Sequence, residues 1–428
     1  MSVVAEPRMN GVKVTTLKNG LRVLTDPMQT VESVSLGLWV DAGTRHEPAQ
    51  INGISHLLEH MAFKGTERRS ARAIAEEMDN VGGHLNAYTA RDHTAYYAKV
   101  LKEDSALALD ILSDILQNST MDAEELAREQ AVVVQEINQS IDTPDDIIFD
   151  HFQSTAFPDQ PLGRPVLGTE ELVRAMNRDT VKGYMSSHYA ASRMVLSAAG
   201  AIDHDQLVDS AEKAFATLAA TAEAQPEAAR YVGGEYREER DIEQVNLVLG
   251  YGGVSYDDPD YYAISVLSTL LGGGMSSRLF QEIREKRGLV YSIYSFASSY
   301  SDGGLFGIYA GTGEDEVEEL VPVLCDEVVK VCGGVAADEM LRARAQLKAS
   351  ILMSLESTSS RCEQLARQVL VYGRPITTQE VVDRIEAIDA AAIARVARRL
   401  FAQVPTIAAI GPLAKLEDHQ SMVARLKL

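Results

Sequence analysis

The chain has 428 residues, which is too long for one ordinary hydrophobic core and predicts two or more domains. Hydrophobic residues make up 46% of it and charged residues 24%, a balance typical of globular rather than disordered proteins. The formal net charge of −22 argues against nucleic-acid binding, because phosphate contacts need a basic surface. This charge has two interpretations: mutual repulsion that keeps the protein soluble, or a negative chamber that attracts basic peptides.

The N-terminal segment favours a cytoplasmic protein. It reads MSVVAEPRMNGVKV and has no basic segment followed by an apolar one, so no secretory signal is visible. Apolar runs such as 407–410 are far shorter than a membrane span, so no membrane partner is expected. The three cysteines are Cys325, Cys332 and Cys362. We expect them to be buried thiols, in agreement with a reducing compartment.

The predicted elements occur twice in the same order, which indicates a duplicated α+β unit. The first copy has a strand at 34–43, a helix at 54–61, a strand at 93–100, and helices at 103–116 and 123–140. The second copy has the matching elements at 245–253, 261–271, 304–310, 314–331 and 337–355. The offset between matched elements is about 211 to 215 residues. We therefore predict two domains, each a mostly antiparallel sheet packed with helices.

The boundary between the two copies is expected within residues 217–235. This stretch is rich in Ala and Glu, contains Pro226 and ends near a Gly pair, which is the composition of a linker. We predict a first domain at 1–220, a linker at 221–235 and a second domain at 236–428.

The segment SHLLEHM, residues 55–61, carries the chemistry in the first predicted helix. His56 and His60 are four residues apart, so both imidazoles project from one helix face and can reach one tetrahedral ion. Glu59 lies near the same face, where its carboxylate can take a proton from an attacking water. This order, H-x-x-E-H, inverts the common H-E-x-x-H zinc motif. The alternative is a half-buried helix with two satisfied histidines, which leaves Glu59 unexplained.

A third protein ligand is expected in the helix at 123–140. Glu136 lies in the apolar run AVVVQEI, where a buried carboxylate is costly without a partner such as zinc. Glu129 lies seven residues earlier on the same face, and could be the ligand instead or orient one. Both could also form ordinary surface salt bridges. The second copy has Ile351 near the position that matches Glu136, and its matching helix lacks histidine. We therefore predict one Zn²⁺ per chain, in the first domain.

The run HLLEHMAFKGT, with Glu136 76 residues after His60, closely resembles the pitrilysin-type zinc peptidases. It is most similar to the mitochondrial processing peptidase branch and its bacterial relatives, and the resemblance covers essentially the whole chain, duplication included. The resemblance implies that His56, His60 and Glu136 are the zinc ligands and that Glu59 is the general base. It also implies that Glu129 supports the site.

Two further sets of residues match substrate-binding positions of that family. The resemblance implies that GGHLNA, residues 82–87, is an edge strand that pairs with the substrate backbone at Asn86 and Ala87. Without the family, Asn86 could equally be a turn residue. Arg284 and Tyr291 have the spacing of the family's carbonyl-binding pair, and both side chains can stabilise an oxyanion. On the residues alone, each is more often structural.

Relatives close two chains into a hollow clamshell, so the resemblance implies a homodimer in which Arg284 and Tyr291 act on the zinc site of the partner chain. We expect a zinc-dependent endopeptidase that hydrolyses short or unfolded peptides, with basic peptides favoured, held as an added β-strand in an acidic chamber. Two alternatives stay open. One is a presequence-processing subunit that needs a different partner subunit, and the other is a noncatalytic peptide-binding scaffold.

Overall fold

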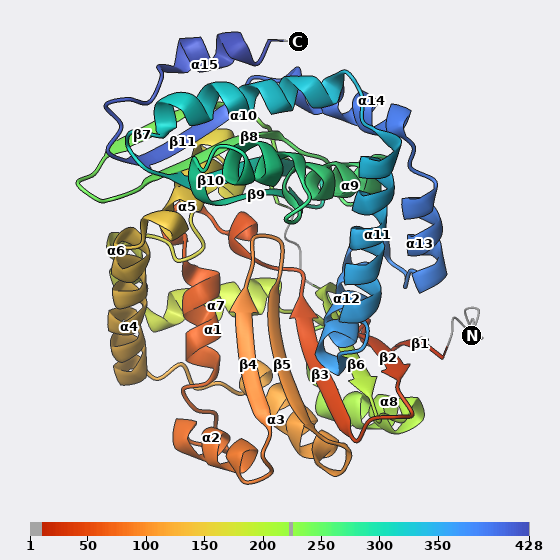
Figure 1. The fold of residues 1–428 in the computed structure, drawn as a ribbon. Coiled ribbons are helices and arrows are strands. Elements are labelled where there is room, and N and C mark those ends of the chain that lie inside the picture. Colours follow the sequence, from red (N-terminus) through yellow and green to blue (C-terminus); the bar gives the residue numbers. More distant parts are fainter. Residues whose placement is uncertain (1–10, 222–225, 428) are drawn as a thin grey trace. The chain divides into compact units, whose positions relative to one another are not determined.

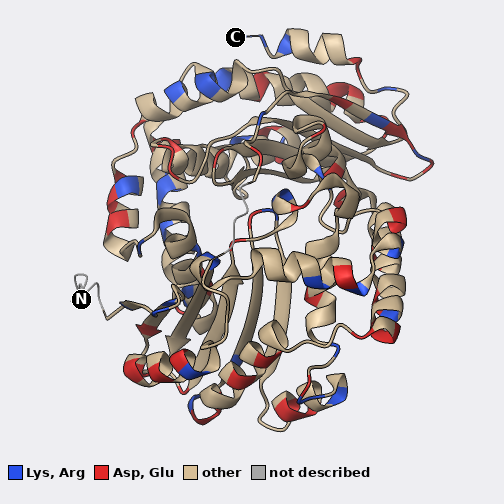
Figure 2. Ribbon diagram, turned by 180° about the vertical axis from the view of Figure 1, so that it is seen from behind, with Lys and Arg blue, Asp and Glu red and all other residues tan. Residues whose placement is uncertain are grey.

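The computed structural model describes residues 11–221 and 226–427, which form two compact units (Figure 1). The first unit comprises Met1–Ile137, Pro165–Glu227 and Met353–Thr377, and the second comprises Asn138–Arg164, Ala228–Leu352 and Thr378–Leu428. Acidic residues are distributed along the helices and loops of both units and are interspersed with Lys and Arg (Figure 2). Within the described ranges, no helix is long and apolar enough to cross a membrane.

The first unit is built on a six-stranded sheet. Its strands, in spatial order, are β1 (Lys13–Thr16), β2 (Arg22–Pro27), β6 (Met194–Gly200), β3 (Ser33–Val40), β5 (Thr94–Leu101) and β4 (His84–Thr89). Strands β2 and β6 run parallel, and the other neighbouring pairs are antiparallel. Strand β6 is buried along its whole length, because helices cover both faces of the sheet centre.

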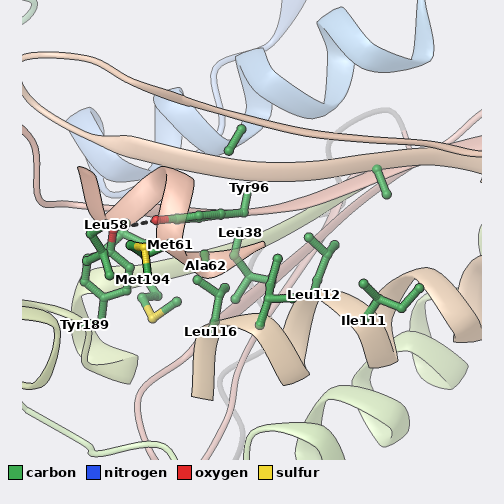
Figure 3. Close-up of a cluster of buried hydrophobic side chains, with 14 of the residues drawn as sticks. Leu38, Leu58, Met61, Ala62, Tyr96, Ile111, Leu112, Leu116, Tyr189 and Met194 are labelled. Atoms are coloured by element: carbon green, nitrogen blue, oxygen red, sulfur yellow. Dashed lines mark hydrogen bonds between the residues drawn. The ribbon is translucent and has the colours of Figure 1, made fainter. Parts of the chain in front are cut away.

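Helices pack on both faces of this sheet. They are α1 (Ile54–Ala62), α2 (Ala71–Asp79), α3 (Ser105–Gln117), most of α4 (Ala123–Ile141), α6 (Glu170–Ala175), α7 (Arg178–His188), α8 (His204–Ala214) and α12 (Thr358–Tyr372). On one face, Leu58 and Met61 of α1 share a core with Leu38 of β3 and Leu112 of α3 (Figure 3). The neighbouring residue Trp39 points to the other face, because side chains alternate along a strand, and packs in the cluster that contains α12.

The second unit repeats this architecture with five strands. In spatial order they are β7 (Gly234–Glu239), β11 (Thr406–Gly411), β8 (Val245–Gly252), β10 (Gly304–Thr312) and β9 (Val290–Ser299). Its helices are α5 (Pro144–Ala156), α9 (Tyr261–Gly272), α10 (Val317–Cys332), most of α11 (Ala337–Ser354), α13 (Thr378–Glu386), α14 (Ala390–Phe401) and α15 (His419–Arg425). The parallel pair, β7 with β11, matches β2 with β6 of the first sheet. The predicted α+β class with two duplicated, mostly antiparallel sheets is therefore confirmed.

The compact units exchange one helix. Helices α5 and α12 occupy the same position in the two copies, since each follows the long helix of its copy. Yet α5 packs on the second sheet, with Phe152 beside Val248 and Ala408, while α12 packs on the first. Because of this exchange, the compact units are not the contiguous ranges 1–220 and 236–428. Those ranges remain a prediction of the functional domains. Residues 222–225 of the predicted linker lie outside the described residues.

All three cysteines are buried, as expected from the sequence. Burial raises the pKa of the Cys325 thiol to about 12. These thiols therefore act as small apolar side chains at neutral pH.

A buried carboxylate holds the start of helix α1, which carries the histidine motif. Glu47 Oε1 accepts a hydrogen bond from the backbone N–H of Ser55 at 2.8 Å. Its Oε2 accepts from the Gly53 N–H at 2.8 Å and from Asn52 Nδ2 at 2.9 Å. Gly53 is the N-cap residue and has a φ of +94°, a conformation that favours glycine. Because Gly53 has no side chain to cap the helix, Glu47 satisfies these donors from outside it.

We predict that Glu47→Ala lowers the free energy of unfolding of the first unit by roughly 3 kcal/mol, because it leaves buried donors unpaired. The only tryptophan of the chain, Trp39, is 2% exposed in the sheet of this unit, so its fluorescence in a urea titration reports on it. Glu76→Ala is the control, because Glu76 pairs with Arg72 on the surface and should contribute about 0.5 kcal/mol or less. Equal urea midpoints for Glu47→Ala and the unmodified protein would contradict the prediction.

Candidate metal centre

Helices α1 and α4 bring three ligand side chains together. His56 Nε2 lies 3.6 Å and His60 Nε2 lies 3.5 Å from Glu136 Oε2. A tetrahedral zinc ion with bonds of about 2.0–2.2 Å needs ligand atoms about 3.3–3.6 Å apart. Two imidazole nitrogens and one carboxylate oxygen are also the donor types that zinc prefers. Among the described residues, this is the one group of three such side chains close enough to hold a metal ion.

The packing of the two helices explains why these side chains converge. Helix α1 buries Leu57, Leu58 and Met61 against the sheet, which leaves the histidine face directed away from the core. Helix α4 buries Val133 and Ile137 in the same core. The ligand side chains are consequently half-buried, with exposed fractions of 12% and 17% for the histidines and 38% for Glu136. The carboxylate of Glu136 is therefore the most exposed of the three ligand side chains.

His56 is in the protonation state that a metal ligand needs. Burial lowers the pKa of His56 to about 4, and the neighbouring His60 acts in the same direction. The imidazole is therefore neutral near neutral pH, with a lone pair available for a metal. The ring centroids of the two histidines are 4.7 Å apart in an edge-on contact. The Nδ1 atom of His56 is buried and has no hydrogen-bond partner within the described part of the chain.

Glu129 lies behind His60 and is set apart from the ligand group. Its Oε2 is 3.0 Å from Nδ1 of His60, while its Oε1 is 2.7 Å from Nζ of Lys64. A carboxylate at this position favours a proton on Nδ1 and leaves the lone pair of Nε2 directed at the metal position. The sequence alone left the choice between Glu136 and Glu129 open. The structure brings Glu136 to the Nε2 atoms and Glu129 to the opposite side of one imidazole.

Glu59 is positioned by a residue that the sequence analysis did not identify. Its Oε2 accepts a hydrogen bond at 2.7 Å from Oγ1 of Thr89, the last residue of β4. Burial raises the pKa of the Glu59 carboxyl, and Glu136 adds to this effect, whereas Thr89 and His60 oppose it. The pairing with Thr89 spans 30 residues, so no local pattern could have revealed it. Lys64 was missed for the same reason, because it lies just past the end of α1 and its partner Glu129 is on a distant segment of the chain.

The predicted substrate strand lies at the edge of the first sheet. Strand β4 ends the strand order and pairs with β5. Asn86 is exposed, and its Oδ1 accepts a hydrogen bond at 2.9 Å from the backbone N–H of Ala87, which is buried. The strand thus begins two residues after the start of the predicted 82–87 segment and continues to Thr89.

Arg284 and Tyr291 belong to the second unit and lie close to each other there. The guanidinium carbon of Arg284 is 5.7 Å from the centre of the Tyr291 ring and 4.8 Å from that of Phe280. Arg284 is part of a single π-helical turn, Phe280–Glu285, and such turns are frequent at functional sites. Tyr291 is on the edge strand β9 and is 77% exposed. The Tyr291 side chain is therefore accessible to solvent, whereas Arg284 is half-buried.

The second copy differs where the first carries its histidines. Helix α9 matches α1, but its residues Ile264, Val266 and Leu267 are buried apolar side chains. It is an apolar core helix and carries no histidine.

The chain is similar to known proteins over most of its length. The model of the insulinase family, peptidase family M16, matches residues 22–170, and that of the peptidase M16 inactive domain matches residues 175–347. An uncharacterized zinc protease of Rickettsia felis is 43% identical over 93% of this chain and 97% of its own length. An uncharacterized zinc protease of Bacillus subtilis is 39% identical over 94% of this chain and 98% of its own length.

Eukaryotic relatives also match nearly the whole of this chain. The probable mitochondrial-processing peptidase subunit β of Arabidopsis thaliana is 40% identical over 96% of this chain and 81% of its own length. A chain of complex III2 from Candida albicans, solved with Inz-5 bound, has the same fold, with a TM-score of 0.86 at 23% identity. That match covers 98% of this chain and 100% of the other. The chain therefore belongs to peptidase family M16, together with bacterial zinc proteases and the β subunits of mitochondrial processing peptidases.

Proposed function

We propose that the protein is a zinc-dependent endopeptidase. The observation that carries this proposal is the convergence of His56, His60 and Glu136 beside the carboxylate of Glu59. The names of the bacterial relatives, zinc proteases, support the same metal and the same class of reaction. The retained ligand group argues against a noncatalytic scaffold, which has no need of it.

Each residue of the site has a separate role in peptide hydrolysis. When bound, zinc would polarise the scissile carbonyl and lower the pKa of the attacking water. Glu59 takes the proton of that water and delivers it to the leaving amine. Its raised pKa helps both transfers, because the carboxyl then holds and releases a proton closer to neutral pH. Thr89 keeps one oxygen of Glu59 in place, so the other stays available for the proton.

The substrate is a short or unfolded peptide bound as an added strand on β4. An extended backbone can pair with a sheet edge, whereas a folded protein rarely offers one. The peptide carbonyl would replace Oδ1 of Asn86 at the N–H of Ala87. Because Thr89 at the end of this strand holds Glu59, a peptide on β4 lies beside the base. The preference for basic peptides in an acidic chamber rests on the net charge of −22.

The active assembly is a homodimer in which Arg284 and Tyr291 of one chain stabilise the oxyanion at the metal centre of the other. The exposure of Tyr291 supports this role. A second candidate is a presequence-processing subunit that needs a different partner. The names of the relatives favour it, because several are the β subunits of mitochondrial-processing peptidases. Cleavage by the purified single chain would support the homodimer.

We predict that Glu59→Gln retains one zinc per chain but lowers kcat at least a hundredfold, because the base is lost while the ligands stay. Metal content is measured by atomic absorption, and activity with a quenched basic peptide. A chelator should abolish cleavage by the unmodified chain, and added zinc should restore it. Full activity of Glu59→Gln with normal zinc content would sink the proposed mechanism.

Thr89→Val should lower kcat about tenfold with unchanged zinc content, since a hydrogen bond to a charged group contributes about 1.5–3 kcal/mol. Thr89→Ser keeps the hydroxyl and is the matched control, with kcat expected within about twofold of the unmodified protein. Both variants are compared in single-turnover cleavage with saturating enzyme. Equal rates for the valine and serine variants would show that the hydroxyl does not position Glu59.

The arrangement in trans predicts complementation between two inactive chains. One chain carries Glu59→Gln, and the other carries Arg284→Ala with Tyr291→Phe. In a mixed dimer, the intact metal centre of the second chain meets the intact pair of the first, so coexpression should restore roughly a quarter of the normal activity. If Arg284 and Tyr291 act within their own chain, every mixed dimer stays inactive and the homodimer model fails.

A further inference from the structure

We propose that Lys64 is a positioning residue of the metal centre, acting through Glu129 on the ligand His60. This inference rests on the proposed function, because it assumes that the histidine pair holds zinc. Lys64 follows the end of α1, and Glu129 lies on α4. The ion pair therefore joins the two helices that carry the three ligands.

Each oxygen of Glu129 has a separate partner. Lys64 Nζ lies 2.7 Å from Oε1, and His60 Nδ1 lies 3.0 Å from Oε2. The Glu129 side chain is 8% exposed and that of Lys64 is 29% exposed. A carboxylate buried to this extent is costly without an opposite charge, and Lys64 supplies that charge. With both oxygens held, the plane of the carboxylate is fixed, and so is the imidazole bonded to it.

The two histidines differ in how they are held. His60 has a fixed partner at Nδ1, whereas Nδ1 of His56 has none among the described residues. Of the two ligand imidazoles, therefore, only that of His60 is oriented by a hydrogen bond at Nδ1 within the described part of the chain, and Glu129 accepts this bond. Loss of Lys64 would free one oxygen of Glu129 and leave a buried charge uncompensated. The imidazole of His60 would then lose its fixed orientation toward Glu136, which is 3.5 Å away at Oε2.

A competing role for Lys64 is purely structural. Its backbone N–H donates to the Met61 carbonyl at 3.2 Å, and a cation at the C-terminal end of α1 interacts favourably with the helix dipole. That role would stabilise the helix without Glu129. The two roles are separable, because positioning through Glu129 disappears when Glu129 cannot carry charge, whereas the helix effect persists.

A double-mutant cycle on zinc affinity tests the proposal. The dissociation constant is measured by competition with a chromogenic chelator for the unmodified chain, Lys64→Met, Glu129→Gln and the double variant. We expect Lys64→Met to weaken zinc binding about tenfold when Glu129 is present, and to change it less than twofold in the Glu129→Gln background. Lys64→Arg keeps the cation and should bind zinc nearly as well as the unmodified chain.

Lys182→Met is the matched control, because Lys182 is a half-buried lysine on α7 and has no place in the metal centre. It should leave the zinc affinity unchanged. Trp39 fluorescence in urea confirms that each variant is folded. At saturating zinc, Lys64→Met should lower kcat more than it raises KM, because the peptide-binding strand β4 is untouched. A helix-capping role alone would alter the urea midpoint and leave this ratio as it is.

The outcomes separate this inference from the proposed function. An equal loss of zinc affinity in both backgrounds, or none in either, would overturn the role of Lys64. Zinc binding by the unmodified chain without any peptide cleavage would end the proposal of an active homodimer and favour the subunit that needs a different partner, while a positive cycle would still support Lys64. A chain that binds no zinc would overturn both.

Discussion

The rest of the site depends on one constraint: helix α1 must bury one face in the core and present its histidines on the other. One face buries Leu58 and Met61 in the core of the first unit, and the other presents His56 and His60. The apolar face sets the rotation of the helix, so the imidazoles need no separate anchor to share one side. The position along its axis is set at the start, where buried Glu47 accepts from the first backbone donors. The packing of α1 in the core therefore also sets the positions of the two histidines.

The second copy shows what the fold does without that division. Helix α9 buries the positions that α1 leaves free, and within the described residues the metal-binding group is confined to the first unit. The second copy instead has the exposed Tyr291 on its edge strand β9, with Arg284 of the π-helical turn close to the Tyr291 ring. The duplicated fold thus gives one copy with the group of metal-binding side chains and another with an apolar core helix in the matching position. Through the exchange of α5 and α12, each compact unit contains one helix from the other copy.

The residues that contact the metal-binding histidine and the proposed base form short chains of hydrogen bonds and ion pairs. His60 contacts buried Glu129, which contacts the more exposed Lys64. On the other side, Glu59 contacts Thr89 at the end of the edge strand. Each of these links uses a charge-assisted hydrogen bond, which is strong in a half-buried site and has a defined direction. The strand that would bind substrate and the helix that would bind metal are joined by one such bond.

The sequence by itself determined the duplicated α+β class and the local motif. Hydrophobic periodicity reports burial, and His56, Glu59 and His60 lie within one and a half turns of a helix, so spacing alone places them on neighbouring faces. Helical spacing left Glu136 and Glu129 open, because seven residues on one helix put both on the same face; the tertiary structure brings Glu136, and not Glu129, to the Nε2 atoms of the histidines. It also decided the partner of Glu59 and the exchange of α5 and α12. Those contacts depend on how distant segments pack, and the side-chain pattern of a segment does not specify which distant surface it meets.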